Sequence, residues 1–198
     1  MGNRQSRAAI HFALVPFLAV PFGIARASDA HASTTDYSIA SLEYALTPME
    51  QVGRVQAGLL CLPKGKLRWR DVARPPDDVM TRRLERVLRD RGMTVAPQPD
   101  PLFGDLPPPT RYRIKIVVDA LSMRLCVPGL GIGEKAPSGS GRLTVRWETW
   151  DREARTLAAS QRYDVPIAIA RRDARTASSV ISDAVVETAM RYAAESSR

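Results

Sequence analysis

Alternation between apolar and polar residues is the feature that most constrains the fold of this chain. The stretch RYRIKIVVDALSMRLC (111–126) begins with apolar residues that alternate with Arg and Lys, and RLTVRWETWD (142–151) repeats the pattern. A period of two places successive side chains on opposite faces of a strand. Both stretches are therefore predicted to be half-buried strands, and residues 53–63 and 156–170 are predicted to be two more.

Two segments have the spacing of helices. Residues 77–92 carry apolar side chains every three or four positions, with Asp77 placed to cap the start and Gly92 to end the helix. Residues 173–197 carry a stripe of small and β-branched side chains, which lets a helix pack closely on a sheet. A short strand or edge segment is expected just after Gly92.

This order of elements predicts an α+β fold. We expect a two-layer sandwich in which two long helices cover one face of a mixed or antiparallel sheet of about four to five strands. The predicted single domain spans 53–198. Residues 28–52 show little pattern and are predicted to be a lead-in segment.

Residues 1–27 have the features of an export signal. A short basic head precedes a largely apolar stretch and a small-x-small exit, so cleavage is expected after Ala27, with Ala30 and Ala32 as alternative sites. The apolar stretch contains two prolines and is near the lower length limit for a membrane span, so no transmembrane span is expected after cleavage. Cleavage after Ala27 removes three arginines and no acidic residue, so the net charge falls from +8 to +5.

The chain has two cysteines, Cys61 and Cys126, and neither lies beside the exit, which disfavours a lipid anchor. Cysteine pairs in exported proteins are commonly oxidised. Both lie near the ends of predicted strands, and their sulfur atoms can meet if those strands are neighbours. We predict a Cys61–Cys126 disulfide and a periplasmic or secreted location.

Few residues are available for catalysis or metal binding. The two histidines, His11 and His31, fall in the leader and beside its cleavage site. A serine or cysteine nucleophile therefore has no base, and a zinc site has too few ligands once the thiols pair. No two carboxylates are placed for acid–base work. We predict a non-enzymatic protein without a cofactor or a metal.

The glycine-rich stretch GLGIGEK (129–135) is similar in composition to a phosphate-binding loop. Its context is wrong for that role, because Lys135 precedes Ala136-Pro137 and leads into a predicted strand rather than a helix. A hairpin loop is the favoured interpretation. Loops of this length can carry function, so its glycines and its lysine remain a candidate partner-contact loop: Gly129, Gly131, Gly133 and Lys135.

Basic residues gather in two places. One group lies on the first predicted helix and the other on an extended segment after Cys61. They admit two interpretations: a solvated surface, or a docking face for polyanions such as acidic glycans, lipid headgroups or an acidic partner. Export disfavours nucleic acid as the ligand. The residues of this candidate face are Arg82, Arg83, Arg86, Arg89, Lys64 and Lys66.

The pattern also resembles periplasmic domains of the curli secretion channel, of the amino-terminal part of the Tol translocation protein, and of envelope-assembly accessory proteins. The resemblance rests on VQAGLLCLP, MTRRLERVLRDRGMTV, YRIKIVVDALS, GRLTVRWETWDREARTLAASQRYDV and SSVISDAVVETAMRYAAE, within residues 53–195. The chain departs from these families in lacking a lipobox cysteine and in having a cysteine pair. The resemblance implies a non-enzymatic scaffold with no catalytic residue to carry over.

These observations lead to three functional hypotheses. The first is a periplasmic binding or assembly module that acts through contacts with envelope proteins or with further copies of itself. The second is a binder of an acidic glycan or lipid headgroup through the arginine-rich helix. The third is an accessory subunit of an envelope hydrolase.

Overall fold

Six strands form one mixed sheet in the described part of the computed structural model, which covers residues 36–98, 110–127, 137–169 and 176–196. These residues belong to a compact unit that spans Ser33–Arg198. The strands are β1 (Tyr37–Tyr44), β2 (Gln51–Ala57), β3 (Leu62–Arg68), β4 (Tyr112–Val127), β5 (Ser138–Asp151) and β6 (Thr156–Ile169).

The long strand β4 organises the sheet. The strand order of the sheet is β3-β2-β4-β5-β6. The pairs β2–β3, β4–β5 and β5–β6 are antiparallel, whereas β2 is parallel to β4. Strand β1 is also parallel to β4 and pairs with residues 112–118, whereas β2 pairs with residues 123–127. Because β5 pairs along nearly the whole of β4, β1 and β2 lie end to end on its other edge. A β-bulge at Asp119, between Val118 and Ala120, interrupts the β4–β5 register near this junction.

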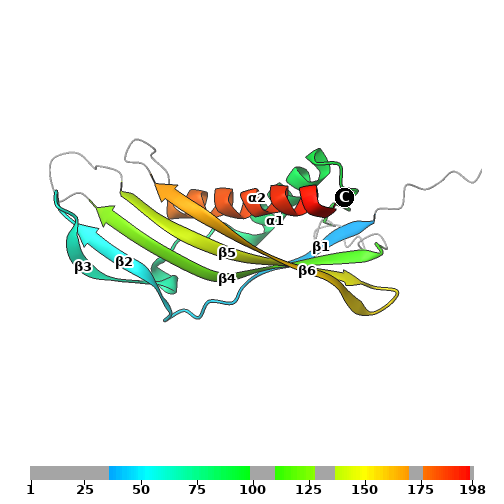
Figure 1. Cartoon of the computed structure of the whole chain (residues 1–198), viewed down its shortest axis with the longest axis horizontal. Coiled ribbons are helices and arrows are strands. Elements are labelled where there is room, and N and C mark those ends of the chain that lie inside the picture. The colour runs from blue at the N-terminus through cyan, green and yellow to red at the C-terminus, as the bar shows by residue number, and fades with distance from the viewer. Residues whose placement is uncertain (1–35, 99–109, 128–136, 170–175, 197–198) are drawn as a thin grey trace, which may run out of the picture. The chain divides into compact units, whose positions relative to one another are not determined.

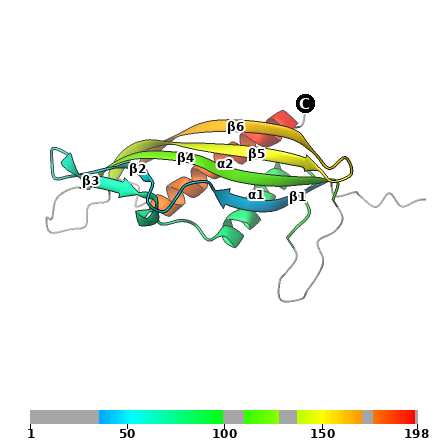
Figure 2. The ribbon, with the colours of Figure 1, turned by 90° about the horizontal axis from the view of Figure 1, so that it is seen from below.

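Two helices and a short 3-10 turn complete the described fold: η1 (Trp69–Asp71), α1 (Asp77–Asp90) and α2 (Ala177–Ser196). Figures 1 and 2 show both helices on the same side of the sheet. Helix α2 packs against β5 and β6, and α1 packs against α2 and β1. We call the sheet face that they cover the inner face and the opposite face the open face.

The core lies between the inner face and the helices. Strand alternation points Ile114, Ile116 and Val118 of β4 into it, all fully buried. The indole of Trp147 stacks on the Tyr192 ring of α2, with ring centroids 4.7 Å apart. Its Nε1–H donates to the Thr188 hydroxyl at 2.9 Å, so the polar atom of this buried side chain is satisfied.

The α+β class and the mixed sheet with two helices are confirmed, but the number of strands, the lengths of the helices and the extent of one strand were wrong. The described sheet has six strands rather than four to five, and the helices are not both long, since α1 has 14 residues and α2 has 20. The additional strands are β1, which lies within the predicted lead-in 28–52, and β3.

The predicted strand 53–63 was wrong in its extent, because β2 ends at Ala57 and the chain turns back through Gly58, whose φ is 80°. The short strand or edge segment expected after Gly92 is a single bridge from Val95 to Tyr37.

None of the helices in the described ranges is both long enough and apolar enough to cross a membrane.

Candidate functional site

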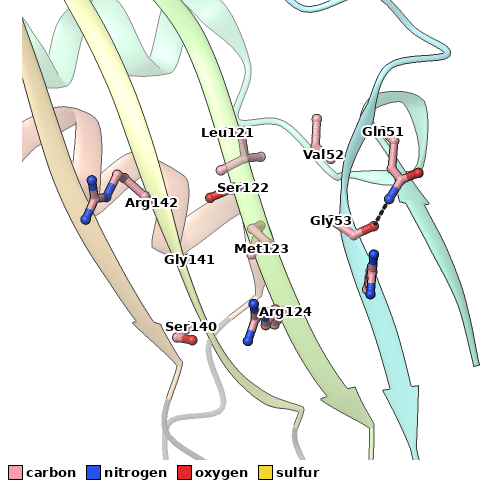
Figure 3. A pocket seen from close by; sticks show the side chains of 11 residues that line it. Gln51, Val52, Gly53, Leu121, Ser122, Met123, Arg124, Ser140, Gly141 and Arg142 are labelled. Carbon is pink, nitrogen blue, oxygen red and sulfur yellow. Dashed lines mark hydrogen bonds between the residues drawn. The ribbon is translucent and has the colours of Figure 1, made fainter. Parts of the chain in front are cut away.

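A groove of about 560 Å³ crosses the sheet where β2, β4 and β5 lie side by side. Figure 3 shows it from close by, with side chains from all three strands around it. Gln51 of β2 lines it, and five further polar side chains come from open-face positions of these strands: Arg54 from β2, Ser122 and Arg124 from β4, and Ser140 and Arg142 from β5.

Small residues explain why the surface is hollow here. In the β4–β5 register, Ser140 lies opposite Arg124, and Ser122 lies opposite Arg142. Each arginine therefore faces a short side chain across the strands. Gly53 and Gly141 also line the groove, and an added Cβ would collide with a backbone carbonyl of β4, that of Met123 or Ser122 respectively. Glycine in a strand commonly marks such a close backbone approach.

The groove concentrates positive charge. Arg54 lies directly opposite Arg124 in the parallel β2–β4 pair, and Lys66 of β3 lies directly opposite Arg54. These three cations therefore occupy one row across adjacent strands, which are about 4.8 Å apart. Arg142, on β5, adds a fourth. Like charges directly opposite each other on a sheet are destabilising.

Carboxylates do not neutralise this row within the described residues. The stretches around it, 51–68, 120–127 and 137–143, contain no Asp or Glu. The closest acidic residue to Arg142 in the register is Asp164, on the neighbouring strand, and Thr144 donates to it at 2.5 Å. None of the four cations forms an ion pair with a described residue.

Cations farther along the open face provide a contrast. Lys115 lies 2.8 Å from Glu43, and Arg146 donates to Asp119 at 3.0 and 3.1 Å and also contacts Glu148. Hydrogen bonds to Asp119 are the main cause of a raised pKa for Arg146. Lys115 and Arg146 are thus paired with nearby carboxylates, whereas the cations at the groove form no ion pair with a described residue.

Most of the arginines predicted to form a docking face on α1 contact other side chains of the same chain. Arg82 contacts Asp78, one turn earlier, and Arg89 lies 4.0 Å from Glu85. Arg83 crosses to α2, where it donates to Ser182 at 2.5 Å and to Asp183 at 2.8 Å. Only Arg86 of this set has no such partner among the described residues.

The structure also separates the two predicted basic groups. Helix α1 covers the inner face, whereas the register places Lys66 beside Arg54 on the open face. Lys64 lies in β3 near a register irregularity. Of the predicted cations, only Lys66 belongs to the row beside the groove. The candidate contact loop, Gly129, Gly131, Gly133 and Lys135, lies outside the described residues.

Cys61 and Cys126 are joined by a disulfide, with their Cα atoms 5.4 Å apart. Cys126 lies on β4 opposite Gln56 of β2. Cys61 lies in the β2–β3 turn, with φ of 49°, rather than at the end of a strand as expected.

The sequence interpretation missed Arg54, Arg124 and Arg142 as site residues. Each belongs to a different strand, so no single basic run of the sequence contains all three. A usable signal was nevertheless present, because all three lie at polar positions of acid-free strand segments. No group of three or more His, Cys, Asp or Glu suited to holding a metal ion occurs in the part of the chain that the structure describes.

Comparison with known proteins leaves the family open. No protein-family model and no curated protein matches the chain. Among solved structures, it is similar to the crystal structure of protein XCC0632 from Xanthomonas campestris, of the family DUF330. The two share 12% sequence identity with a TM-score of 0.46, over 80% of this chain and 81% of that chain. A likeness at this level assigns neither family nor function.

Proposed function

We propose that this protein is a non-enzymatic, extracytoplasmic binding module whose groove holds a ligand with several negative charges. The observation that carries the proposal is the row Lys66, Arg54 and Arg124, in which each cation lies directly opposite the next. Such a row costs stability in the free protein. An anionic ligand would remove this repulsion and form charge-assisted hydrogen bonds with the guanidinium groups.

The spacing of the cations favours a multivalent anion over a single small one. Cations on three adjacent strands span about 10 Å, since neighbouring strands lie about 4.8 Å apart, and Arg142 extends the set onto β5. Two sources offer negative charges at this spacing: an acidic glycan, and the headgroups of an anionic lipid surface. In both cases the recognised chemistry is a series of phosphate, sulfate or carboxylate groups.

The composition of the groove supports a binding role rather than catalysis. Its hydroxyl groups, Ser122 and Ser140, lie among arginines, and none of the described residues that line it carries an imidazole or a carboxylate. The leader-like residues 1–27 and the disulfide support placement outside the cytoplasm.

A binding assay with a defined polyanion tests this function. The chain from Ser28 to Arg198, which contains every core residue that the structure describes, is titrated with dextran sulfate at several salt concentrations. We expect Arg54→Gln/Arg124→Gln to weaken binding by about tenfold or more, because each charge-assisted hydrogen bond contributes about 1.5–3 kcal/mol. The salt dependence should also become shallower.

The matched control is Arg82→Gln/Arg86→Gln, which removes the same charge from α1. We expect it to bind nearly as the unmodified chain does. Equal losses for both double variants would show that net charge alone is responsible and would contradict a groove site.

A second candidate is the assembly module that the curli-type and Tol-type resemblance implies. The observation that favours it is the outer edge of β6, which pairs only with β5 among the described strands. Its first part, residues 156–161, carries no charge, and such edges can pair with a strand from another chain. Sedimentation over a range of concentrations tests self-association through this edge. If the chain self-associates, Ala159→Lys should abolish it, and association that survives would exclude this edge.

A further inference from the structure

The turn between β2 and β3 exposes a cluster of leucines. Leu59, Leu60 and Leu62 are 85%, 79% and 62% exposed, the highest values among the large apolar side chains of the described residues. They surround Cys61, within four consecutive positions. We call Leu59, Leu60 and Leu62 the leucine tip.

The leucine tip belongs to an ordered turn. The disulfide ties Cys61 to the end of β4. The Gly58 N–H donates to the Val127 carbonyl at 3.1 Å, and the Cys61 N–H donates to the Gly58 carbonyl at 3.2 Å. The fold therefore holds the leucines out from the end of the hairpin, although their burial inside the protein would be favourable.

Positive charge begins immediately behind the leucine tip. A strand rises about 3.3 Å per residue, so Lys64 lies about 7 Å and Lys66 about 13 Å along β3 from Leu62. Arg54 and Arg124 lie in the same row as Lys66, on the next two strands, at the edge of the groove. Residues 51–68 contain no acidic residue.

We propose that the leucine tip inserts into the interface of an anionic lipid bilayer, so that the cations behind it contact the headgroups. Membrane-surface elements bury apolar side chains about 5–10 Å into the boundary between headgroups and acyl chains, with Lys and Arg at the headgroup level. Along the hairpin the leucines come first and a band of Lys and Arg side chains follows, which matches that layering in both polarity and charge. This inference rests on the proposed function, since it names lipid headgroups as the source of the anionic groups in the groove.

Vesicle binding by the chain from Ser28 tests the proposal without interference from the apolar leader. The probes are vesicles of phosphatidylcholine alone and vesicles that also contain phosphatidylglycerol, with dextran sulfate as the soluble anion. We expect the unmodified chain to prefer the anionic vesicles. Leu59→Ser/Leu60→Ser should weaken that binding by about tenfold or more and leave dextran sulfate binding unchanged.

A depth measurement supplies an independent readout. Leu60→Trp places an indole at the leucine tip, and brominated acyl chains quench an indole only when it enters the bilayer. We expect additional quenching relative to the unmodified chain, whose own tryptophans, Trp69, Trp147 and Trp150, lie outside the tip.

The outcomes separate the two proposals. Two results would overturn the insertion of the leucine tip: no binding to the anionic vesicles, or full binding by Leu59→Ser/Leu60→Ser with no quenching of Leu60→Trp. Neither result would contradict the proposal that the groove binds soluble anions. If Arg54→Gln/Arg124→Gln binds dextran sulfate normally, the proposed groove function fails, whereas loss of vesicle binding by the leucine variant would still support insertion. Normal vesicle binding by the leucine variant together with capture of a single envelope protein would reassign the tip to a protein partner and overturn the lipid proposal.

Discussion

At the scale of single residues, glycine positions shape the sheet around the groove. Gly53, Gly139 and Gly141 all lie where an added Cβ would meet a backbone carbonyl of β4. A carbonyl in a paired strand cannot move without disturbing its hydrogen bonds. Substitution at these positions therefore displaces one strand relative to another. Gly65 of β3 differs, because nothing lies within 4 Å of its Cβ position.

We predict that Gly53→Ala lowers the free energy of unfolding by about 1–3 kcal/mol, the usual cost of forcing extra volume into a packed site. Gly65→Ala is the matched control and should change stability by less than about 0.5 kcal/mol. Urea unfolding followed by circular dichroism measures both. Equal midpoints for the two variants would show that β2 can shift away from β4 at no cost.

Residue patterns in the sequence indicated the cysteine pair but not the groove. Cys61 and Cys126 could be paired because the chain offers no other choice. The groove depends on which strands are neighbours and on their register, which sets Arg54 opposite Arg124. Alternation assigns each arginine to the polar face of its own strand but does not indicate which strand lies beside it or in which register. Long-range pairing is therefore the information that the local pattern lacks.

A buried carboxylate connects α1 to the segment after it. Glu85 is 2% exposed and accepts a hydrogen bond from the Gln98 N–H at 3.0 Å. Burial raises the pKa of this carboxyl above its ordinary value, against the opposing effects of Arg89 and the Gln98 N–H. The folded state therefore holds this proton more tightly than the unfolded state does. Its contribution to stability falls as the pH rises from the ordinary carboxyl pKa through the raised one.

Glu85→Gln should remove that pH dependence, because the amide oxygen can still accept the Gln98 hydrogen bond without becoming charged. We expect the melting temperature of the variant relative to the unmodified chain to increase as the pH rises from 4 toward 7, the window above the ordinary carboxyl pKa. Thermal melts across this range measure the difference. A difference that decreases with rising pH would mean that pairing with Arg89 outweighs burial.

At the scale of elements, β1 shows what the sequence pattern left out. Its residues 37–44 were assigned to a lead-in, because their apolar positions shift phase within the strand. The structure shows the cause, an irregularity in the β1–β4 register between Ile39 and Ser41. Ile39 and Leu42 lie on either side of this irregularity, and both side chains still reach the core. The long strands and the two helices were predictable because each keeps its periodicity over a longer run of residues, as β4 does up to Val118.

We therefore predict that a chain beginning at Gly53, the expected domain boundary, does not fold cooperatively. It lacks β1 and the buried side chains Ile39, Leu42, Leu46 and Val52. Truncating one such aliphatic side chain costs about 2–5 kcal/mol, and whole domains are stable by only about 5–15 kcal/mol. Circular dichroism and urea unfolding compare it with the chain from Ser28. A cooperative transition at the same midpoint in both chains would show that β1 is dispensable.

At the scale of the whole molecule, the disulfide is a long-range constraint on the chain. It joins residues 65 positions apart, and the enclosed segment contains β3, η1, α1 and most of β4. In the unfolded chain this crosslink closes a long loop and restricts the conformations available to it. In the folded chain it fixes the β2–β3 turn to the end of β4, next to the groove. The same bond thus acts on global stability and on the local order of the leucine tip.

We predict that Cys61→Ser/Cys126→Ser lowers the free energy of unfolding by about 4 kcal/mol, the value that loop-closure entropy gives for a loop of this length. Urea unfolding with and without reductant measures it: reductant should destabilise the unmodified chain by a similar amount and leave the double variant unchanged. A thiol assay under denaturant on protein recovered after export provides the matching chemical measurement, with no free thiol expected before reduction. Two free thiols per exported chain, or an unfolding midpoint that reductant does not move, would contradict the role of this crosslink.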